Sequence, residues 1–352
     1  MGTITFLLVL SFLVFFHELG HFLAARYFGV KVHVFSIGFG KQLFKKEWMG
    51  TTWQLALIPL GGYVKMKGQD DSKPSLSEEG DDSYNTKKPW QRILILFAGP
   101  FANFILAAVL FFSIALLGAT SWAPQVGTVM KDSPAYKAGI LQNDEIVRIN
   151  NHEIKVWEDI GKIIIDTNGA LKFYIKRDGK LIAKTINPLV SDAQNMFKEK
   201  IRKRMIGISP SGKIVELKLS FSESLVYAYE KTIFASTMIF QGVQKLIQGV
   251  IPSSEVGGVI SIGKVISDAS QSSIIALLSI TALISVNLGV LNLLPIPALD
   301  GGHIMFNLYE MITRRKPSDK VFMFLTIMGW VILGSLMLLG IYNDVNRIFL
   351  ND

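Results

Sequence analysis

Three ionisable residues stand close together in an apolar stretch near the start of the chain. His17, Glu18 and His21 lie in FLLVLSFLVFFHELGHFLAAR, which occupies residues 6–26. Residues four apart on a helix share one face, so the two imidazoles can bind one metal ion. The intervening glutamate is placed to take a proton from a water molecule at that metal. The pattern predicts a zinc site with His17 and His21 as ligands and Glu18 as general base.

A second polar interruption occurs late in the chain. In NLLPIPALDGGH, which runs from Asn292 to His303, two prolines and two glycines break an apolar helix where Asp300 appears. Broken helices at membrane depth usually line a site. Asp300 is therefore the expected third ligand of a His₂Asp zinc site, with a helix-capping role as the alternative. We expect His303 to lie in a turn or to support a ligand rather than to be one, and His33 and His152 to be surface or loop residues unrelated to the site.

The composition indicates an integral membrane protein. Half of the 352 residues are hydrophobic and the mean hydropathy is +0.37, which is too apolar for an ordinary soluble protein. The chain has no cysteine, which excludes disulfides, iron–sulfur clusters and thiolate zinc sites. Much of the net charge of +8 flanks apolar segments. That pattern favours positive-inside topology and contact with anionic lipid over nucleic-acid binding.

Four apolar segments are long enough to cross a bilayer. We expect transmembrane helices at residues 4–25, 93–117, 272–294 and 321–341. Arg26 and Lys31 follow the first segment, which places its end in the cytoplasm and the N-terminus outside. A cleaved signal peptide is the alternative for this segment, although no basic residue precedes it.

The unusual polar residues lie at similar depths in these segments. His17 stands nine residues before Arg26, and Asn103 stands eleven residues after Arg92. At about 1.5 Å per helical residue, both lie roughly 14–17 Å inside the cytoplasmic boundary. Asp300 ends a segment that runs towards the same face. The site is therefore expected in the cytoplasmic half of the bilayer, where Asn103 would bind the substrate carbonyl or support helix–helix contact.

Residues 30–68 read as strands and hairpins rather than helix, and Gly61-Gly62 breaks the pattern before Tyr63. The segment is apolar enough to be a re-entrant β region, and an edge strand there could hold an extended peptide. An ordinary cytoplasmic β-rich loop is the alternative. Residues 69–89 are acidic and serine-rich, as in a mobile loop.

The remaining segments complete the domain organisation. Residues 122–212 have a soluble α/β composition, with a hairpin around Asp178-Gly179. Residues 213–271 are expected to form an interfacial amphipathic helix and a linker. Residues 1–121 and 272–352, the latter including the Leu-Asp-Gly motif at 299–301, would form the two parts of the membrane core.

These motifs together resemble the site-2 protease family, in particular its bacterial regulator-of-sigma-E protease branch. The resemblance rests on HELGH, on Gly99-x-x-x-Asn103, on Asn-x-x-Pro-x-Pro-x-Leu-Asp-Gly-Gly at 292–302, and on SPAYKAGILQNDEIVRINN, which resembles a circularly permuted PDZ domain. It implies a polytopic α-helical membrane protein with about four transmembrane helices, a membrane-associated β-hairpin region and one inserted extracytoplasmic PDZ (α/β) domain.

The resemblance also implies an activity. It indicates a zinc-dependent intramembrane endopeptidase of the bacterial inner membrane that performs regulated intramembrane proteolysis. The implied substrates are single-span membrane proteins of the anti-sigma factor or remnant signal peptide type. Best-known branch members carry two PDZ domains, whereas this sequence has room for one, so a two-PDZ size filter does not carry over.

The resemblance implies a metal-binding, catalytic or substrate-binding role for particular residues of this chain. The ligands correspond to His17, His21 and Asp300, and the base to Glu18. Asn103 and Asn292 fall on positions linked to substrate accommodation, and residues 61–66, with Gly61, Gly62 and Tyr63, resemble the family's membrane-re-entrant β-loop.

The expected partners are single-span substrates, membrane lipid and a peptide ligand of the PDZ domain, without nucleic acid. A catalytically silent PDZ-containing membrane adaptor is the main alternative, and the intact Glu18 argues against it. A metal transporter fits poorly, because four spans show no internal repeat.

Overall fold

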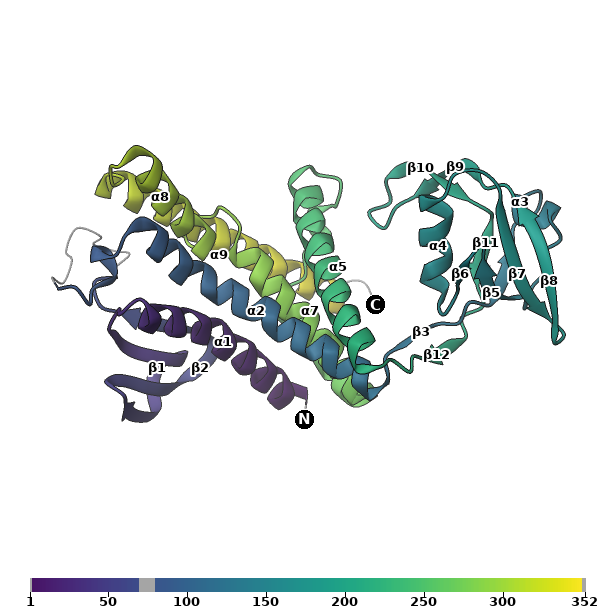
Figure 1. Cartoon of the computed structure of the whole chain (residues 1–352). Helices are drawn as coiled ribbons and strands as arrows, with labels where there is room; N and C mark the ends of the chain where they lie inside the picture. The colour runs from purple at the N-terminus through teal and green to yellow at the C-terminus, as the bar shows by residue number, and fades with distance from the viewer. Residues whose placement is uncertain (1, 70–79, 350–352) are drawn as a thin grey trace. The chain divides into compact units, whose positions relative to one another are not determined.

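The computed structural model describes residues 2–69 and 80–349, and the chain forms two compact units (Figure 1). The first unit combines both ends of the chain, Met1–Ile114 and Glu223–Asp352. The second unit is the intervening segment Ala115–Ser222. The second unit is therefore inserted between the two segments of the first unit, in the order in which the sequence predicts a soluble module within a membrane core.

Four helices of the described chain are long and apolar enough to cross a membrane. They are α1 (Gly2–Tyr27), α2 (Pro89–Gly118), α7 (Ile274–Asn292) and α9 (Asp319–Phe349). Each contains or closely matches one of the four predicted spans, so this part of the fold is confirmed. Many large apolar side chains on these helices stay exposed, as expected of surfaces that face lipid. Examples are Leu8, Leu23, Ile105, Phe324 and Leu338.

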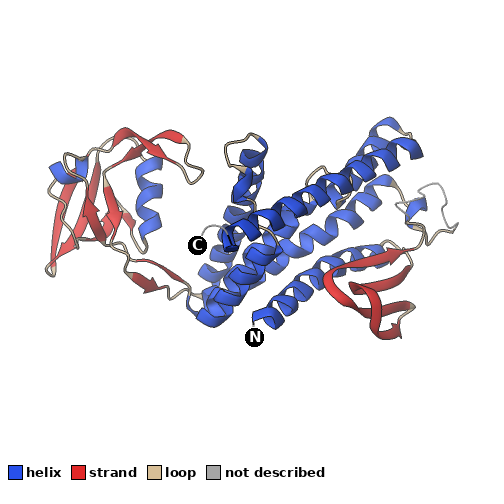
Figure 2. Cartoon of the chain, turned by 180° about the vertical axis from the view of Figure 1, so that it is seen from behind, coloured by secondary structure: helices blue, strands red, loops and turns tan. Residues whose placement is uncertain are grey.

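A bent β-sheet lies against α1 in the first unit (Figures 1 and 2). It consists of β1 (Val32–Trp48) and β2 (Thr51–Met66), which confirms the strands predicted for this region. Residues 34–37 have partners in both 52–55 and 62–65, so β2 lies on either side of β1. The prediction that the chain breaks at Gly61-Gly62 is wrong. Strand β2 continues through these glycines, and the residues on both sides of them pair with β1.

Glycine allows β1 to bend between these pairings. Gly38 has φ +90°, a conformation that a residue with a Cβ rarely adopts. A Cβ there would also lie 2.9 Å from the Ile58 carbonyl oxygen. The sheet is joined to the helices by a buried apolar cluster, which holds β1 and β2 against α1 and α2. Its members are Ala25, Val30, Val32, Met66, Tyr84 and Ile95.

About half of the predicted mobile loop at 69–89, residues 70–79, lies outside the described residues. Its described end contains the short 3₁₀ helix η1 (Tyr84–Thr86). Before this helix, Lys67 Nζ donates to Asp82 Oδ1 at 2.6 Å. That hydrogen bond lowers the pKa of the Asp82 carboxyl group, so this connection carries an ionised acid at neutral pH.

The segment expected to hold one interfacial helix and a linker contains two helices, α5 (Phe221–Ile247) and α6 (Val259–Ser272). The helix α5 is not among the candidate spans. Small and polar side chains form its buried face, whereas Leu225, Tyr229 and Ile233 are exposed. This pattern fits the predicted amphipathic helix, and its place at a membrane interface stays a prediction. The linker assignment is wrong for α6, which packs against α1 and α7.

The C-terminal part of α9 anchors the start of α6. Asp344 is fully buried, and its carboxylate accepts hydrogen bonds from the backbone N–H groups of Gly258, Ile260 and Ser261 at 2.9–3.0 Å. The Ser261 hydroxyl also donates to it. A carboxylate at a helix N-terminus satisfies otherwise unpaired N–H groups and complements the helix dipole. This contact fixes the position of α6, which packs against α1.

The second unit is built on a four-stranded antiparallel sheet (Figure 2). Its spatial order is β6 (His152–Glu153), β5 (Glu145–Ile149), β7 (Leu171–Arg177) and β8 (Lys180–Ile186). The predicted hairpin around Asp178-Gly179 joins β7 and β8. Alternate residues of β7, namely Leu171, Phe173 and Ile175, are fully buried, as expected for a strand with one face on the core.

Helices and paired short strands complete the second unit. The helices are α3 (Pro134–Lys137) and α4 (Trp157–Asp166). The paired short strands are β9 (Leu189–Gln194) with β10 (Lys200–Met205), β4 (Val126–Val129) with β11 (Ile208–Pro210), and β3 (Thr120–Trp122) with β12 (Ile214–Glu216). The α/β character of the module is therefore confirmed, while its identification as a PDZ domain stays an interpretation.

Candidate metal centre

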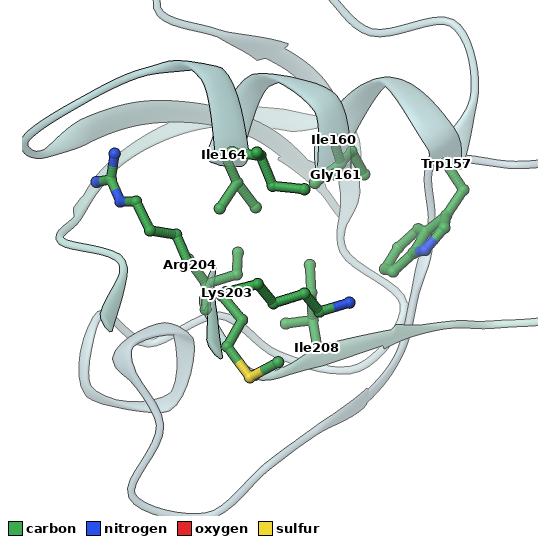
Figure 3. Close-up of a pocket in the computed structure, with 11 residues that line it drawn as sticks. Trp157, Ile160, Gly161, Ile164, Lys203, Arg204 and Ile208 are labelled. Atoms are coloured by element: carbon green, nitrogen blue, oxygen red, sulfur yellow. The ribbon is translucent and has the colours of Figure 1, made fainter. Parts of the chain in front are cut away.

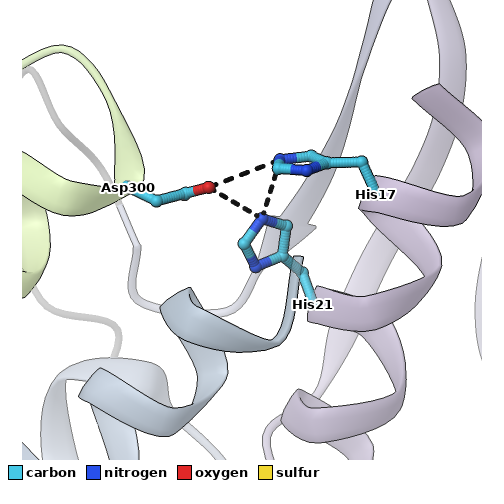
Figure 4. Close-up of side chains that lie close together, drawn as sticks. All are labelled: His17, His21 and Asp300. Atoms are coloured by element: carbon cyan, nitrogen blue, oxygen red, sulfur yellow. Dashed lines mark hydrogen bonds and ion pairs between the residues drawn. The ribbon is translucent and has the colours of Figure 1, made fainter. Parts of the chain in front are cut away.

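The three predicted ligands meet at one point (Figure 4). His17 and His21 extend from successive turns of α1, and Asp300 is the first residue of α8 (Asp300–Thr313). Their facing atoms form a small triangle. The two Nε2 atoms are 3.2 Å apart, and Asp300 Oδ2 is 3.3 Å from His17 Nε2 and 3.4 Å from His21 Nε2.

This triangle matches the requirements of zinc. Ligand atoms at about 2.0–2.2 Å from a tetrahedral zinc ion lie about 3.3–3.6 Å from one another. Asp300 Oδ2 is also buried without a hydrogen-bond partner in the described part of the chain. A buried carboxylate oxygen normally has such a partner, and a metal ion would satisfy it. Three protein ligands leave a fourth tetrahedral position open, which is the arrangement of catalytic rather than structural zinc sites.

The close approach of α1 and α2 orients His21. Its Nδ1 donates to the Ile95 carbonyl at 2.9 Å, which leaves Nε2 free to bind a metal. The approach depends on two glycines. A Cβ on Gly20 would lie 2.1 Å from the Ala98 carbonyl oxygen, and a Cβ on Gly99 would lie 2.2 Å from His21 Nε2. Both distances are far below van der Waals contact, so only glycine fits.

Gly99→Ala is therefore expected to displace the His21 imidazole and to weaken zinc binding by about tenfold or more, as loss of a ligand-orienting contact does. Competition with a chromophoric chelator would measure the zinc dissociation constant. Gly334→Ala is the matched control, because Gly334 also lies in a long apolar helix but has open space around it. Equal zinc affinities for the two variants would contradict the packing argument.

The broken helix before Asp300 brings its carboxylate to the histidines. α7 ends at Asn292, and α8 begins eight residues later with Leu299 as its N-cap residue. The following glycines let the new helix begin against the preceding turn. A Cβ on Gly301 would lie 2.3 Å from the Leu294 carbonyl oxygen, and one on Gly302 would lie 2.3 Å from that of Ile296.

A buried ion pair holds the far end of α8 against α2. Arg92 Nη2 lies 2.7 Å from Glu310 Oε1, and the two side chains are 8% and 15% exposed. Asp300 and Glu310 are ten residues apart on one helix, about 15 Å along its axis. The pair therefore fixes the direction of the helix that carries the third ligand.

Arg92→Met is expected to destabilise the protein by about 3–5 kcal/mol, because it leaves Glu310 buried and unpaired. The double variant Arg92→Met/Glu310→Met should be less destabilised than this single variant. Thermal or denaturant unfolding in detergent would measure the difference. The exposed pair Arg202–Asp192, with side chains 75% and 87% exposed, supplies the control, since such pairs contribute about 0–1 kcal/mol. Additive single-variant effects at Arg92 and Glu310 would contradict the coupling.

A cavity of about 410 Å³ opens onto the three ligands. Glu18 lines it. Three predicted substrate-binding residues, Gly62, Tyr63 and Asn292, also line it. The structure thus brings the expected general base, the β2 strand and the metal ligands to one hollow.

Two other predicted substrate-binding residues do not line this cavity, namely Gly61 and Asn103. Asn103 is fully buried beside His17, with its side-chain nitrogen 3.1 Å from His17 Nδ1. The cavity also has polar lining residues that the sequence did not reveal, Lys65 and Gln69. Alternation along β2 could have indicated Lys65, which lies two residues beyond Tyr63.

The other histidines lie elsewhere. The His303 ring contacts Phe306 and Phe322, and His152 is exposed at the edge of the second unit. Neither belongs to the cluster of ligand atoms, and His33 does not belong to it either. His303 lies within helix α8 rather than in a turn.

Comparisons with known proteins cover almost the whole chain. The model of peptidase family M50 matches residues 5–336. A Campylobacter jejuni protein named "Putative zinc metalloprotease" is 48% identical over 341 residues, which cover 97% of this chain and 92% of that protein. A Helicobacter pylori protein of the same name is 38% identical, covering 97% and 98% of the two chains. A Rickettsia conorii protein of that name is 35% identical and covers 99% of each.

Proposed function

The chain belongs to peptidase family M50 and is a multi-pass membrane zinc metalloprotease; from this premise we propose that it cleaves other proteins within their membrane-spanning segments. The proposed substrates are single-span membrane proteins of the anti-sigma factor or remnant signal peptide type, cut in regulated intramembrane proteolysis. One observation carries the proposal most strongly. The ligand triangle and Glu18 lie in one cavity between elements that include three candidate spans, α1, α2 and α7.

The residues around the cavity have separable roles in peptide-bond hydrolysis. His17, His21 and Asp300 would hold a zinc ion, which would supply a Lewis acid for the scissile carbonyl and for the attacking water. Glu18 accepts the proton of the attacking water and then delivers it to the leaving amine. The open cavity admits the water that hydrolysis consumes. The three ligands and the general base are all present, so an active protease is favoured over a catalytically silent adaptor.

The edge of β2 is suited to hold an extended substrate. Residues 62–65 pair with β1, and within the described chain this stretch has no second β partner on its other edge. Gly62, Tyr63, Val64, Lys65 and Met66 line the cavity. A transmembrane helix must unwind before a protease can reach its backbone, and an unpaired strand edge offers hydrogen bonds to the unwound segment. Asn292 lines the cavity as well and can contact the same segment.

The second unit offers a separate place for a peptide. A groove of about 190 Å³ lies between α4 and residues 203–208 (Figure 3). Ile160 and Ile164 give it an apolar wall, and Lys203 and Arg204 add positive charge. A groove between a helix and a strand is where a PDZ fold takes a peptide. We propose that this unit is an extracytoplasmic PDZ domain, with the N-terminus also outside and the metal centre in the cytoplasmic half of the inner membrane.

The test is cleavage of a defined single-span substrate by the full-length protein in liposomes. One substrate carries a helix-destabilising Asn-Pro pair in its span, and a matched substrate carries Leu-Leu at the same positions. We expect cleavage of the first, with mass spectrometry placing the cut inside the span, and much slower cleavage of the second. Cuts confined to soluble segments outside the bilayer would contradict intramembrane proteolysis.

A further inference from the structure

We propose that Asn103 is a positioning residue for the metal ligand His17, which it holds through its side-chain carbonyl. Asn103 lies on α2 and is fully buried, and its side-chain amide lies 3.1 Å from His17 Nδ1. It does not line the cavity that reaches the metal ligands. The side chain is therefore placed to act on a ligand rather than on a substrate in that cavity.

The orientation of the amide determines which nitrogen of His17 carries the proton. With Nδ2 towards the ring, as the structure has it, Asn103 donates to His17 Nδ1. The ring proton then lies on Nε2, the atom that faces Asp300 and His21, and a protonated Nε2 cannot bind a metal. In this orientation Asn103 Oδ1 is also buried without a hydrogen-bond partner among the described residues.

A half-turn of the amide gives the arrangement that metal binding requires. The oxygen and nitrogen of an asparagine side chain are assigned from the hydrogen-bond network. With Oδ1 towards the ring, Asn103 accepts the Nδ1–H of His17, and the Nε2 lone pair points at the metal position. Metal-bound histidines usually donate their other ring nitrogen in this way, which fixes the ring and raises its basicity.

The second histidine of the site already has this arrangement. His21 Nδ1 donates to the backbone carbonyl of Ile95 at 2.9 Å. Asn103 lies eight residues further along the same helix, close to two turns. The backbone of Asn103 is itself held, because Ser285 Oγ of α7 donates to its carbonyl at 2.8 Å. Helix α2 therefore supplies an acceptor to each histidine, one from its backbone and one from a side chain.

Two substitutions of Asn103 separate this role from simple packing. Asn103→Leu keeps the volume but has no acceptor, and we expect its zinc dissociation constant to rise by about 10–100-fold. Asn103→Asp keeps an acceptor for Nδ1–H, and we expect it to retain most of the zinc affinity. Chelator competition on the full chain in detergent measures both. Asn343→Leu is the control and should keep wild-type zinc affinity, because Asn343 is also a buried asparagine on an apolar helix but bonds to the backbone carbonyls of Ser253 and Val256.

A spectroscopic measurement on the unmodified protein keeps the proposal testable if a variant fails to fold. In zinc-loaded protein labelled with ¹⁵N-histidine, we expect two protected Nδ1–H signals, from His17 and His21. Asn103→Leu should lose one of them. Wild-type affinity in Asn103→Leu, or a single protected signal in the wild type, would overturn the proposal. These readouts need no substrate, so they are independent of whether transmembrane segments are cleaved.

Discussion

Glu18→Gln is expected to lower the rate of peptide-bond cleavage by about 10²–10⁴-fold, the usual contribution of general acid–base catalysis. Glutamine has nearly the same shape as glutamate but cannot accept a proton. Glu18 lines the cavity beside the ligands but is not one of the three clustered ligand residues. The variant should therefore keep the zinc site and lose the proton transfer.

Cleavage of the helix-destabilised substrate and zinc content should be measured on the same Glu18→Gln sample. The control is Glu145→Gln in the second unit, an exposed acid on β5, which should cleave at the wild-type rate. Loss of zinc from Glu18→Gln would show that the residue supports the metal instead. Wild-type cleavage by this variant would remove Glu18 from the mechanism.

Asp300→Ala should abolish both zinc binding and cleavage, with a loss of affinity beyond the roughly 10–100-fold caused by removing an outer contact. The two histidines would remain, but they supply only two of the three protein ligands of a catalytic site. Because α8 begins at Asp300, the alanine also removes a carboxylate from a helix N-terminus, at a cost of about 0.3–1 kcal/mol. That cost is too small to unfold the protein.

Chelator competition and the same cleavage assay would test Asp300→Ala. Asp268→Asn is the matched control, because Asp268 is an exposed acid on α6, away from the ligand cluster. Excess zinc should restore little activity to Asp300→Ala. Retention of wild-type zinc affinity would move the third ligand to another residue, and His303 would be the first candidate to examine.

Local patterns in the sequence predicted the elements that have a clear hydrophobic periodicity or end at recognisable turn residues. The i, i+4 histidines, the four apolar helices and the β7–β8 hairpin depend on neighbours in the chain, and these predictions agree with the structure. The helix α6 was missed because its 14 residues mix apolar and polar side chains after a stretch rich in glycine and serine. Its stability comes from Asp344 and from α1, which are distant in sequence.

Long-range pairs explain what the sequence left open at the site. Nothing near Arg92 indicates Glu310 as its partner, because the two residues are more than 200 positions apart. An asparagine within a span can face a cavity, a helix or a ligand, and only packing distinguishes these cases. Asn103 was expected either at the substrate carbonyl or in a helix–helix contact, and the structure places it on α2 against His17 of α1. Gly61-Gly62 suggested a turn, but pairing with β1 on both sides keeps β2 continuous.

The distance along the chain between the histidines and Asp300 has a consequence for biosynthesis. His17 and His21 lie on the first helix, whereas Asp300 follows the third of the four candidate spans. At about 5–20 residues per second, a ribosome needs on the order of tens of seconds to pass from one to the other. Throughout that interval the nascent chain lacks its third metal ligand and should be unable to hydrolyse peptide bonds. A product truncated before α8 should likewise be inert, so errors in translation do not release an uncontrolled protease into the membrane.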